Sequence, residues 1–234
     1  MNSAAAGRLA RRAARSLVAM TLFGTPLVLL TFAVRQRSDA VVALDDGVIR
    51  AATDVARAAH LVAPLVVVQE VTQPVVVYAA STLVVVRVAV ATGARRRATW
   101  AFVTMMAGWG LGALAKLVVK RARPVLDSPL AHPHGYSFPS GHALNATTAA
   151  AVLLVLAWPL MSPARRRIAV AAAVLAVLLV DLDRVLLGAH FPSDVIAGHL
   201  IGLGLTLASW TAFVRPTAVT SSSEPSPPAS SSGG

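Results

Sequence analysis

Residues 98–124 read ATWAFVTMMAGWGLGALAKLVVKRARP and follow directly on three arginines, Arg95 to Arg97. No charged side chain interrupts residues 98–115, and the stretch ends in a cluster of cations before Pro124. A helix needs about 20 mostly apolar residues to cross the hydrocarbon core of a bilayer. The sequence therefore predicts a membrane-spanning helix over residues 98–119, with positive charge at both of its ends.

The whole chain shares this apolar character. Of its 234 residues 56% are hydrophobic and 13% are charged, against roughly 45–50% and about 25% in soluble domains. A chain this apolar cannot bury its side chains in one water-soluble core, which argues against a soluble globular enzyme and predicts an integral membrane protein. Cysteine is absent, so disulfide scaffolds, thiolate metal sites and cysteine nucleophiles are excluded.

Six apolar runs are long enough to span a bilayer, and they predict an all-α bundle of six transmembrane helices within residues 17–214. The runs are residues 17–34, 64–91, 98–119, 142–161, 168–187 and 195–214. The second run is long and contains Pro74, so we expect it to start at the membrane interface. The first run has the basic flank of a signal peptide, but its length and the lack of an A-x-A site favour an uncleaved helix.

Three further segments complete the predicted plan. Residues 1–16 form a basic N-terminus, and residues 35–60 form an amphipathic segment of mixed charge that is expected at the extracytoplasmic surface. Residues 215–234 are rich in Ser, Pro and Gly, and are too polar to pack against the bundle. They are predicted to be a disordered cytoplasmic tail.

The positions of the basic residues set the expected orientation. Eleven of the 21 basic residues lie in the N-terminus, the 93–97 loop, the 162–167 loop and the C-terminus, whereas the four arginines of residues 35–60 are balanced by aspartates. The positive-inside rule then places both termini in the cytoplasm. A nucleic-acid surface would mix its basic residues with aromatic and polar ones, so the net charge of +11 is interpreted as topology and no nucleic-acid partner is expected.

Three polar clusters fall on the opposite, extracytoplasmic side. The first ends the third run, where Lys116, Lys120 and Arg123 share one helical face. Lys116 lies about one turn inside an apolar run, where an ionisable group is costly and is a functional candidate by default. Snorkelling to the headgroups or binding of anionic lipid is the alternative interpretation.

The second cluster opens the fourth run with the sequence FPSGHALNATT, residues 138–148. Ser140 is expected to cap the helix, which leaves the amides of Gly141 and His142 free to bind an anion at the positive end of the helix dipole. His142 lies in the first turn and can reach the same anion. Taken alone, this tripeptide would equally suit a simple helix cap.

The third cluster, DRVLLGAHFPSDVIAG at residues 183–198, joins the last two runs. His190 lies in the turn, and Asp194 follows it in the first turn of the last helix. This carboxylate can accept a hydrogen bond from one imidazole nitrogen, which fixes the tautomer and exposes the other nitrogen as a nucleophile. The alternatives are a favourable helix-terminal charge for Asp194 and an ion pair with Asp181 for Arg184.

Together the clusters hold cations, a helix N-terminus, two histidines and a carboxylate, which are the groups that phosphoryl transfer requires. No cluster of acidic residues suited to Mg²⁺ accompanies them, so we predict no metal site and no cofactor. The cations are expected to stabilise the negative charge of the phosphoryl group instead.

The motifs Lys116-x6-Arg123-Pro124, Pro139-Ser140-Gly141-His142 and Arg184-x5-His190-x3-Asp194 resemble the three-part signature of the type 2 phosphatidic acid phosphatase (PAP2) superfamily. That superfamily also contains vanadium haloperoxidases and bacterial acid phosphatases, and this chain resembles its bacterial membrane-bound lipid phosphatases over residues 40–214. One position departs from the pattern. Asp183 stands where the family usually has serine, and it could weaken the pull of Arg184 on phosphate or point away.

The resemblance implies a role for each site residue. His190 would attack phosphorus, Asp194 would orient it, and His142 would protonate the leaving group and then activate water. The phosphoryl oxygens would be held by Lys116, Arg123, Ser140, Gly141 and Arg184. The substrate would be a lipid phosphate or polyprenyl pyrophosphate in the plasma membrane, with phosphatidic acid, phosphatidylglycerophosphate and undecaprenyl or decaprenyl carriers all fitting. A phosphotransferase and a non-catalytic binding or transport protein are the alternatives.

Overall fold

The structure is a computed structural model, and it describes residues 3–126, 129–131 and 133–213. Within these residues the fold is all-α, as predicted. The helices are α1 (Ser3–Arg35), α2 (Asp39–Ala58), α3 (Val62–Val71), α4 (Pro74–Thr92), α5 (Arg95–Val119), α6 (Gly141–Ala157), the short η1 (Trp158–Leu160), α7 (Pro163–Leu186) and α8 (Pro192–Phe213). The tail predicted at residues 215–234 lies outside the described residues.

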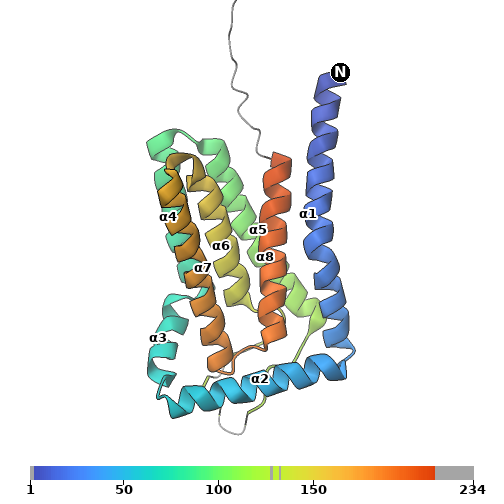
Figure 1. Ribbon diagram of the computed structural model, residues 1–234, viewed down its shortest axis with the longest axis vertical. Helices are drawn as coiled ribbons and strands as arrows, with labels where there is room; N and C mark the ends of the chain where they lie inside the picture. Colours follow the sequence, from blue (N-terminus) through green and yellow to red (C-terminus); the bar gives the residue numbers. More distant parts are fainter. Residues whose placement is uncertain (1–2, 127–128, 132, 214–234) are drawn as a thin grey trace, which may run out of the picture.

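Six long helices, α1 and α4 to α8, run side by side, and α2 lies across one end of them (Figure 1). Helices α4, α5 and α8, the part of α1 from Leu9 to Arg35 and the stretch from Gly141 to Leu160 are each long and apolar enough to cross a membrane. Helix α7 lies alongside them but carries more charge, with three arginines in its first turns and Asp181, Asp183 and Arg184 near its end. The chain is a multi-pass membrane protein.

Two predicted boundaries differ from the structure. The first helix begins at Ser3 and not at residue 17, because the alanines and arginines of the N-terminal segment favour helix. The predicted run 64–91 is divided into α3 and α4. Pro74 is the first residue of α4, and Gln73 before it is extended, with ψ 140°. Proline disfavours a helical conformation in the preceding residue, so the chain breaks there and α4 alone forms the span.

Helix α2 explains how the end of the bundle is covered. Its buried residues, Asp45, Ile49, Thr53 and Ala56, recur at the spacing of one helical face. This face packs against α7 and α8, and α3 then turns away at 113°. The buried face contains a carboxylate, Asp45, which is fully buried.

Helix α6 is central and contacts α4, α5, α7 and α8. Its approach to α8 requires glycine at two positions. A Cβ atom on Gly198 would lie 2.9 Å from the backbone nitrogen of Leu144, and one on Gly202 would lie 3.0 Å from Oγ1 of Thr148. Small residues let helix backbones approach closely within a membrane. The contact sets the first turn of α6 against the first turn of α8.

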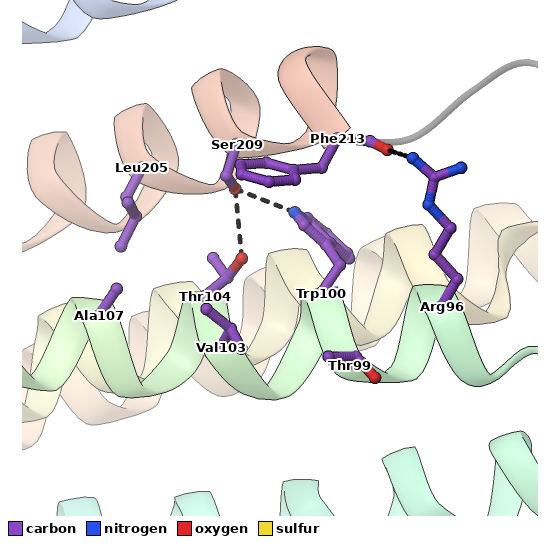
Figure 2. A pocket seen from close by; sticks show the side chains of 9 residues that line it. All are labelled: Arg96, Thr99, Trp100, Val103, Thr104, Ala107, Leu205, Ser209 and Phe213. Atoms are coloured by element: carbon purple, nitrogen blue, oxygen red, sulfur yellow. Dashed lines mark hydrogen bonds between the residues drawn. The ribbon is translucent and has the colours of Figure 1, made fainter.

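The opposite end of the bundle contains a groove between α5 and α8 (Figure 2). Its volume is about 460 Å³. Trp100 donates a hydrogen bond of 3.1 Å to Ser209, and Arg96 at its mouth donates one of 2.7 Å to the carbonyl of Phe213 at the end of α8. The polar contacts here join helices to each other and fix the ends of the spans.

Candidate active site

The three motifs meet at the end of the bundle that α2 covers. The amide of Ser140 donates to the carbonyl of Asp194 at 2.9 Å, which joins the second motif to the third. Arg123 donates to the carbonyl of Ala189 at 2.7 Å, which joins the first motif to the third. Segments that are far apart in sequence thus form one hydrogen-bonded unit.

His190 lies between α7 and α8 and is buried. Gly188, with φ 68°, ends α7 in the left-handed conformation that glycine adopts without strain, and the amide of His190 then donates to the carbonyl of Arg184 at 3.2 Å. Nδ1 of His190 lies 3.5 Å from a carboxylate oxygen of Asp194. Nε2 lies 3.3 Å from Arg123.

Burial lowers the pKa of His190 to about 4. Asp194 opposes this shift through its hydrogen bond and its charge, and the positive charges of Arg123 and Lys116 add smaller contributions that lower the pKa. The imidazole is therefore neutral at neutral pH. The tautomer with its proton on Nδ1, on the side of Asp194, has the lone pair on Nε2, at the side where Arg123 lies.

Asp194 is held by donors from three segments. Its carboxylate accepts hydrogen bonds from the hydroxyl of Ser137, from the amide of Phe191 at 3.0 Å and from Arg121 at 2.7 Å. The residue is fully buried. These contacts fix the carboxylate against His190 and stabilise its negative charge.

Two predicted cations are anchored on loop carbonyls. Arg123 donates to the carbonyls of Gly135 and His134, each at 3.0 Å, and Lys116 donates to the carbonyl of Tyr136 at 2.7 Å. Lys116 also interacts electrostatically with Arg123 and Asp194. Both charges are positioned by neutral groups, so they remain available to an anion.

Arg184 is held differently. It forms a buried ion pair with Asp183 and donates a hydrogen bond of 3.1 Å to Gln69. Asp183 therefore does not point away, and its charge offsets that of Arg184. Asp181, the alternative partner considered for Arg184, instead lies 2.9 Å from Nε2 of His199.

Helix α6 presents the second motif. Ser140 caps it as predicted, its hydroxyl accepting from the amide of Ala143 at 3.4 Å. Nε2 of His142 is buried and has no hydrogen-bond partner among the residues that the structure describes. His142 interacts electrostatically with Arg184, His190, Arg123 and Lys116. A buried histidine nitrogen with no partner, close to several cations, is suited to exchange a proton with a bound anion.

Sequence reasoning gave no role to the polar residues that hold Asp194 in place. Arg121 binds Asp194 and also forms an ion pair of 2.6 Å with Asp45 of α2. Asp45 accepts from the amide of Ser193 at 3.0 Å. The available signal was the position of Asp45, the one charged residue on the buried face of an amphipathic helix.

Over the described residues, no group of three or more His, Asp or Glu side chains is arranged as a metal site. Apart from Asp194, the charged groups that act on His190 and His142 are cations. The arrangement can neutralise the oxygens of a phosphoryl group, present a neutral imidazole nitrogen to phosphorus, and exchange a proton through a second imidazole.

Known proteins are similar to this chain in sequence and in fold. The chain is 39% identical to phosphatidylglycerophosphatase B of Bacillus subtilis over 46% of this chain and 55% of that protein. It is 38% identical to an undecaprenyl-diphosphatase of Sulfolobus acidocaldarius over 44% of this chain and 46% of that protein. It is 37% identical to a decaprenylphosphoryl-5-phosphoribose phosphatase of Mycobacterium tuberculosis over 49% of this chain and 60% of that protein. These matches span about half the length of the curated relatives.

The fold matches the crystal structure of a transmembrane PAP2 type phosphatidylglycerolphosphate phosphatase from Bacillus subtilis with a TM-score of 0.72 and 22% identity, over 83% of this chain and 94% of that chain. The model of the PAP2 superfamily matches residues 97–218, which is more than half of the chain and contains all three motifs. The protein therefore belongs to the PAP2 superfamily.

Proposed function

We propose that this protein is a membrane phosphatase that hydrolyses a lipid phosphate or polyprenyl pyrophosphate through a phosphohistidine intermediate, without a metal ion. One observation carries the proposal. His190 is buried and neutral, with Asp194 at Nδ1 and Arg123 beside Nε2. A protein that only bound phosphate would need the cations and would have no use for a nucleophile with its tautomer fixed.

The reaction proceeds in two steps. In the first, the lone pair of Nε2 of His190 forms a bond to phosphorus, the bond from phosphorus to the lipid oxygen breaks, and His142 gives a proton to that oxygen. In the second, His142 takes a proton from water, the water oxygen bonds to phosphorus, and the phosphorus–nitrogen bond breaks to release phosphate. Asp194 stabilises the positive charge that the imidazole carries between the steps.

The phosphoryl oxygens carry negative charge throughout and are stabilised by the cations. Lys116 and Arg123, fixed by carbonyls, contribute the larger part, and the amide of Gly141 at the start of α6 adds the helix dipole. The hydroxyl of Ser140 is a further donor. Arg184 contributes less than the other cations because Asp183 shares its charge.

The location of the site supports an amphiphilic substrate. The site lies at one end of a bundle of apolar helices, beneath an amphipathic helix, so a lipid tail can remain in the bilayer while its phosphate reaches His190. The relatives named above act on phosphatidylglycerophosphate, undecaprenyl diphosphate and a decaprenylphosphoryl sugar, as their names state. Arg95 to Arg97 and the arginines that open α7 lie at the opposite end, which supports a plasma-membrane protein with cytoplasmic termini and an extracytoplasmic site.

The test is phosphate release from a panel of lipid phosphates by the purified protein in the presence of EDTA. We expect release by the wild type and none by His190→Ala. Brief incubation with ³²P-labelled substrate should label the wild type with an acid-labile, alkali-stable phosphate. Tight binding without release would contradict the proposal in favour of a binding protein, and release that requires an added acceptor alcohol would contradict it in favour of a phosphotransferase.

A further inference from the structure

A basic cavity adjoins the candidate active site on the side of α1 and α2. Its volume is about 620 Å³. Arg123 and Phe191 belong to its lining, and these are the residue beside Nε2 of His190 and the residue that follows His190. The guanidinium of Arg121 lies 4.1 Å above the ring of Phe191. The cavity is therefore continuous with the cations that the proposed chemistry uses.

The charge of this cavity is not balanced. Its described lining contains Arg35, Arg37, Arg50, Lys120, Arg121 and Arg123, with Asp46 as the acid. Three of the four aspartates of α2 are already engaged: Asp45 with Arg121, Asp46 with Arg50 at 3.8 Å, and Asp54 with Arg57 at 3.1 Å. The fourth, Asp39 in the first turn of α2, is not part of the cavity lining. Residues 35–60 contain equal numbers of arginines and aspartates, but in the lining of this cavity the cations outnumber the acid.

The excess resides on Arg35, Arg37 and Lys120, for which no carboxylate partner occurs among the residues described. Arg37 and Lys120 both have φ 51°, a left-handed conformation in which glycine is the favoured residue. Placing a cation at such positions costs free energy. Both side chains line the cavity, and binding of an anion there would offset this cost.

We propose that this cavity binds a second phosphate of the substrate, so that the enzyme favours lipids with two phosphates over lipids with one. The substrate class is then a lipid diphosphate or a phosphomonoester joined to its lipid through a phosphodiester. The inference rests on the proposed function, because it assigns the second phosphate of a substrate whose terminal phosphate is attacked by His190.

Three features fit this ligand. Arg123 belongs to both sites, so an anion in the cavity and one at His190 are neighbours. Arginine and lysine side chains bind phosphate through charge-assisted hydrogen bonds. The remaining lining includes Val34, Val42, Val119 and Val125, so a chain that carries phosphate at its end meets apolar surface as well as cations. A simple lipid phosphate would leave the cavity without an anion.

The experiment compares substrates that differ in the second phosphate, in neutral detergent micelles. One pair is farnesyl diphosphate and farnesyl monophosphate, and the other is phosphatidylglycerophosphate and phosphatidic acid. The variants are Arg37→Gln, Lys120→Gln and the double variant. Arg57→Gln is the matched control, because Arg57 lies on the same helix that covers the site but outside the cavity. Removing positive charge from the outer face leaves the arginine bias toward the cytoplasm intact, so the variants should keep their orientation.

We expect the double variant to lose about tenfold in kcat/KM on at least one two-phosphate substrate, with less than a twofold change on both single-phosphate substrates and in Arg57→Gln. Equal losses on all four substrates, or no loss on any, would overturn the subsite. So would a loss that occurs only in vesicles with added phosphatidylglycerol, because the cavity would then bind bulk anionic lipid. The proposed function fails separately, if the wild type releases phosphate from none of the four.

Discussion

The two ends of the bundle both carry clustered arginines, and the clusters differ in what they contact. At the end of the bundle where α5 and α7 begin, Arg96 donates to the last carbonyl of α8, and Arg166 donates to the carbonyl of Trp158 and stacks over its ring. Arg96 is exposed and Arg166 is half-buried, and both bind carbonyl groups at helix ends. At the other end, Arg121 and Arg123 are partly buried and tied to Asp194 and to carbonyls around His190. A cation in a membrane protein is best interpreted from its partners and burial, since sequence clusters look alike at both ends.

The largest effect is expected at the end of the bundle that contains the site, when the proposed nucleophile His190 is replaced. His190→Ala should lower phosphate release by roughly 10⁴-fold or more, since removing a nucleophile leaves only binding and electrostatic stabilisation. His199→Ala is a matched control, because this histidine binds Asp181 and Thr147 within the bundle and lies outside the proposed chemistry. Activity of His190→Ala near that of the wild type would refute the assignment.

Replacing the second histidine should have the next largest effect. His142→Ala removes the proposed acid and base, and general acid–base catalysis contributes about 10²–10⁴-fold. The loss should be smaller on a substrate with a good leaving group, such as p-nitrophenyl phosphate, which needs no proton. An equal loss in the rate at which both kinds of substrate phosphorylate the enzyme would contradict the role as acid.

Replacing Arg121, which links Asp45 of α2 to Asp194, should have a smaller effect. Arg121→Lys keeps the charge but cannot bridge Asp45 and Asp194 in the same geometry, so we expect kcat to fall roughly tenfold to a hundredfold. Arg166→Lys at the opposite end is the matched control, with an expected change of less than twofold. Activity assays in micelles after checking thermal stability would separate misplacement of Asp194 from unfolding.

The pH dependence reports on His190 directly. Its pKa is lowered to about 4, so the imidazole is unprotonated above this pH, and its protonation should not limit the rate between about pH 8 and 5. Below pH 4 the lone pair is lost and kcat/KM should fall about tenfold per pH unit. Asp194, Arg123 and Lys116 face this group. A limb of the profile that is absent in His142→Ala would belong to His142 instead.

The smallest effect is expected at Asp183. Asp183→Ser removes the carboxylate that pairs with Arg184 and installs the residue typical of the family. Arg184 then binds phosphate more strongly, and the inhibition constant of inorganic phosphate should fall severalfold. An unchanged constant would show that Arg184 does not reach the phosphoryl group.

Much of the fold was predictable because a bilayer imposes a simple rule on length and hydropathy. The apolar runs predicted the helices of the bundle, and Pro74 marked the place where the long second run divides. The start of the first helix was predicted too late, since Ala and Arg continue a helix beyond the apolar run. Helix α7 was found by its apolar middle, although its end carries Asp181, Asp183 and Arg184.

The site also contains a part that the sequence predicted and a part that it did not. Motif spacing predicted that Lys116, Arg123, His142, His190 and Asp194 would come together, because each motif sits at a helix end on one side of the membrane. The partners of these residues were not predictable. Asp45 and Arg121 are separated by 76 residues, and periodicity cannot show which carboxylate a given arginine will meet. The pairing of Arg184 with its neighbour Asp183 depends on side-chain directions that spacing does not define.

The ion pair between Asp45 and Arg121 also affects the order of assembly. Asp45 belongs to the first third of the chain, yet it accepts a hydrogen bond from Ser193, 148 residues later. Contacts this distant in sequence form late, after the intervening helices are in place. The contact between Asp45 and Ser193 therefore forms only after α8 has been inserted. Catalytic competence is expected to appear only at the final stage of biogenesis, when the chain closes on itself.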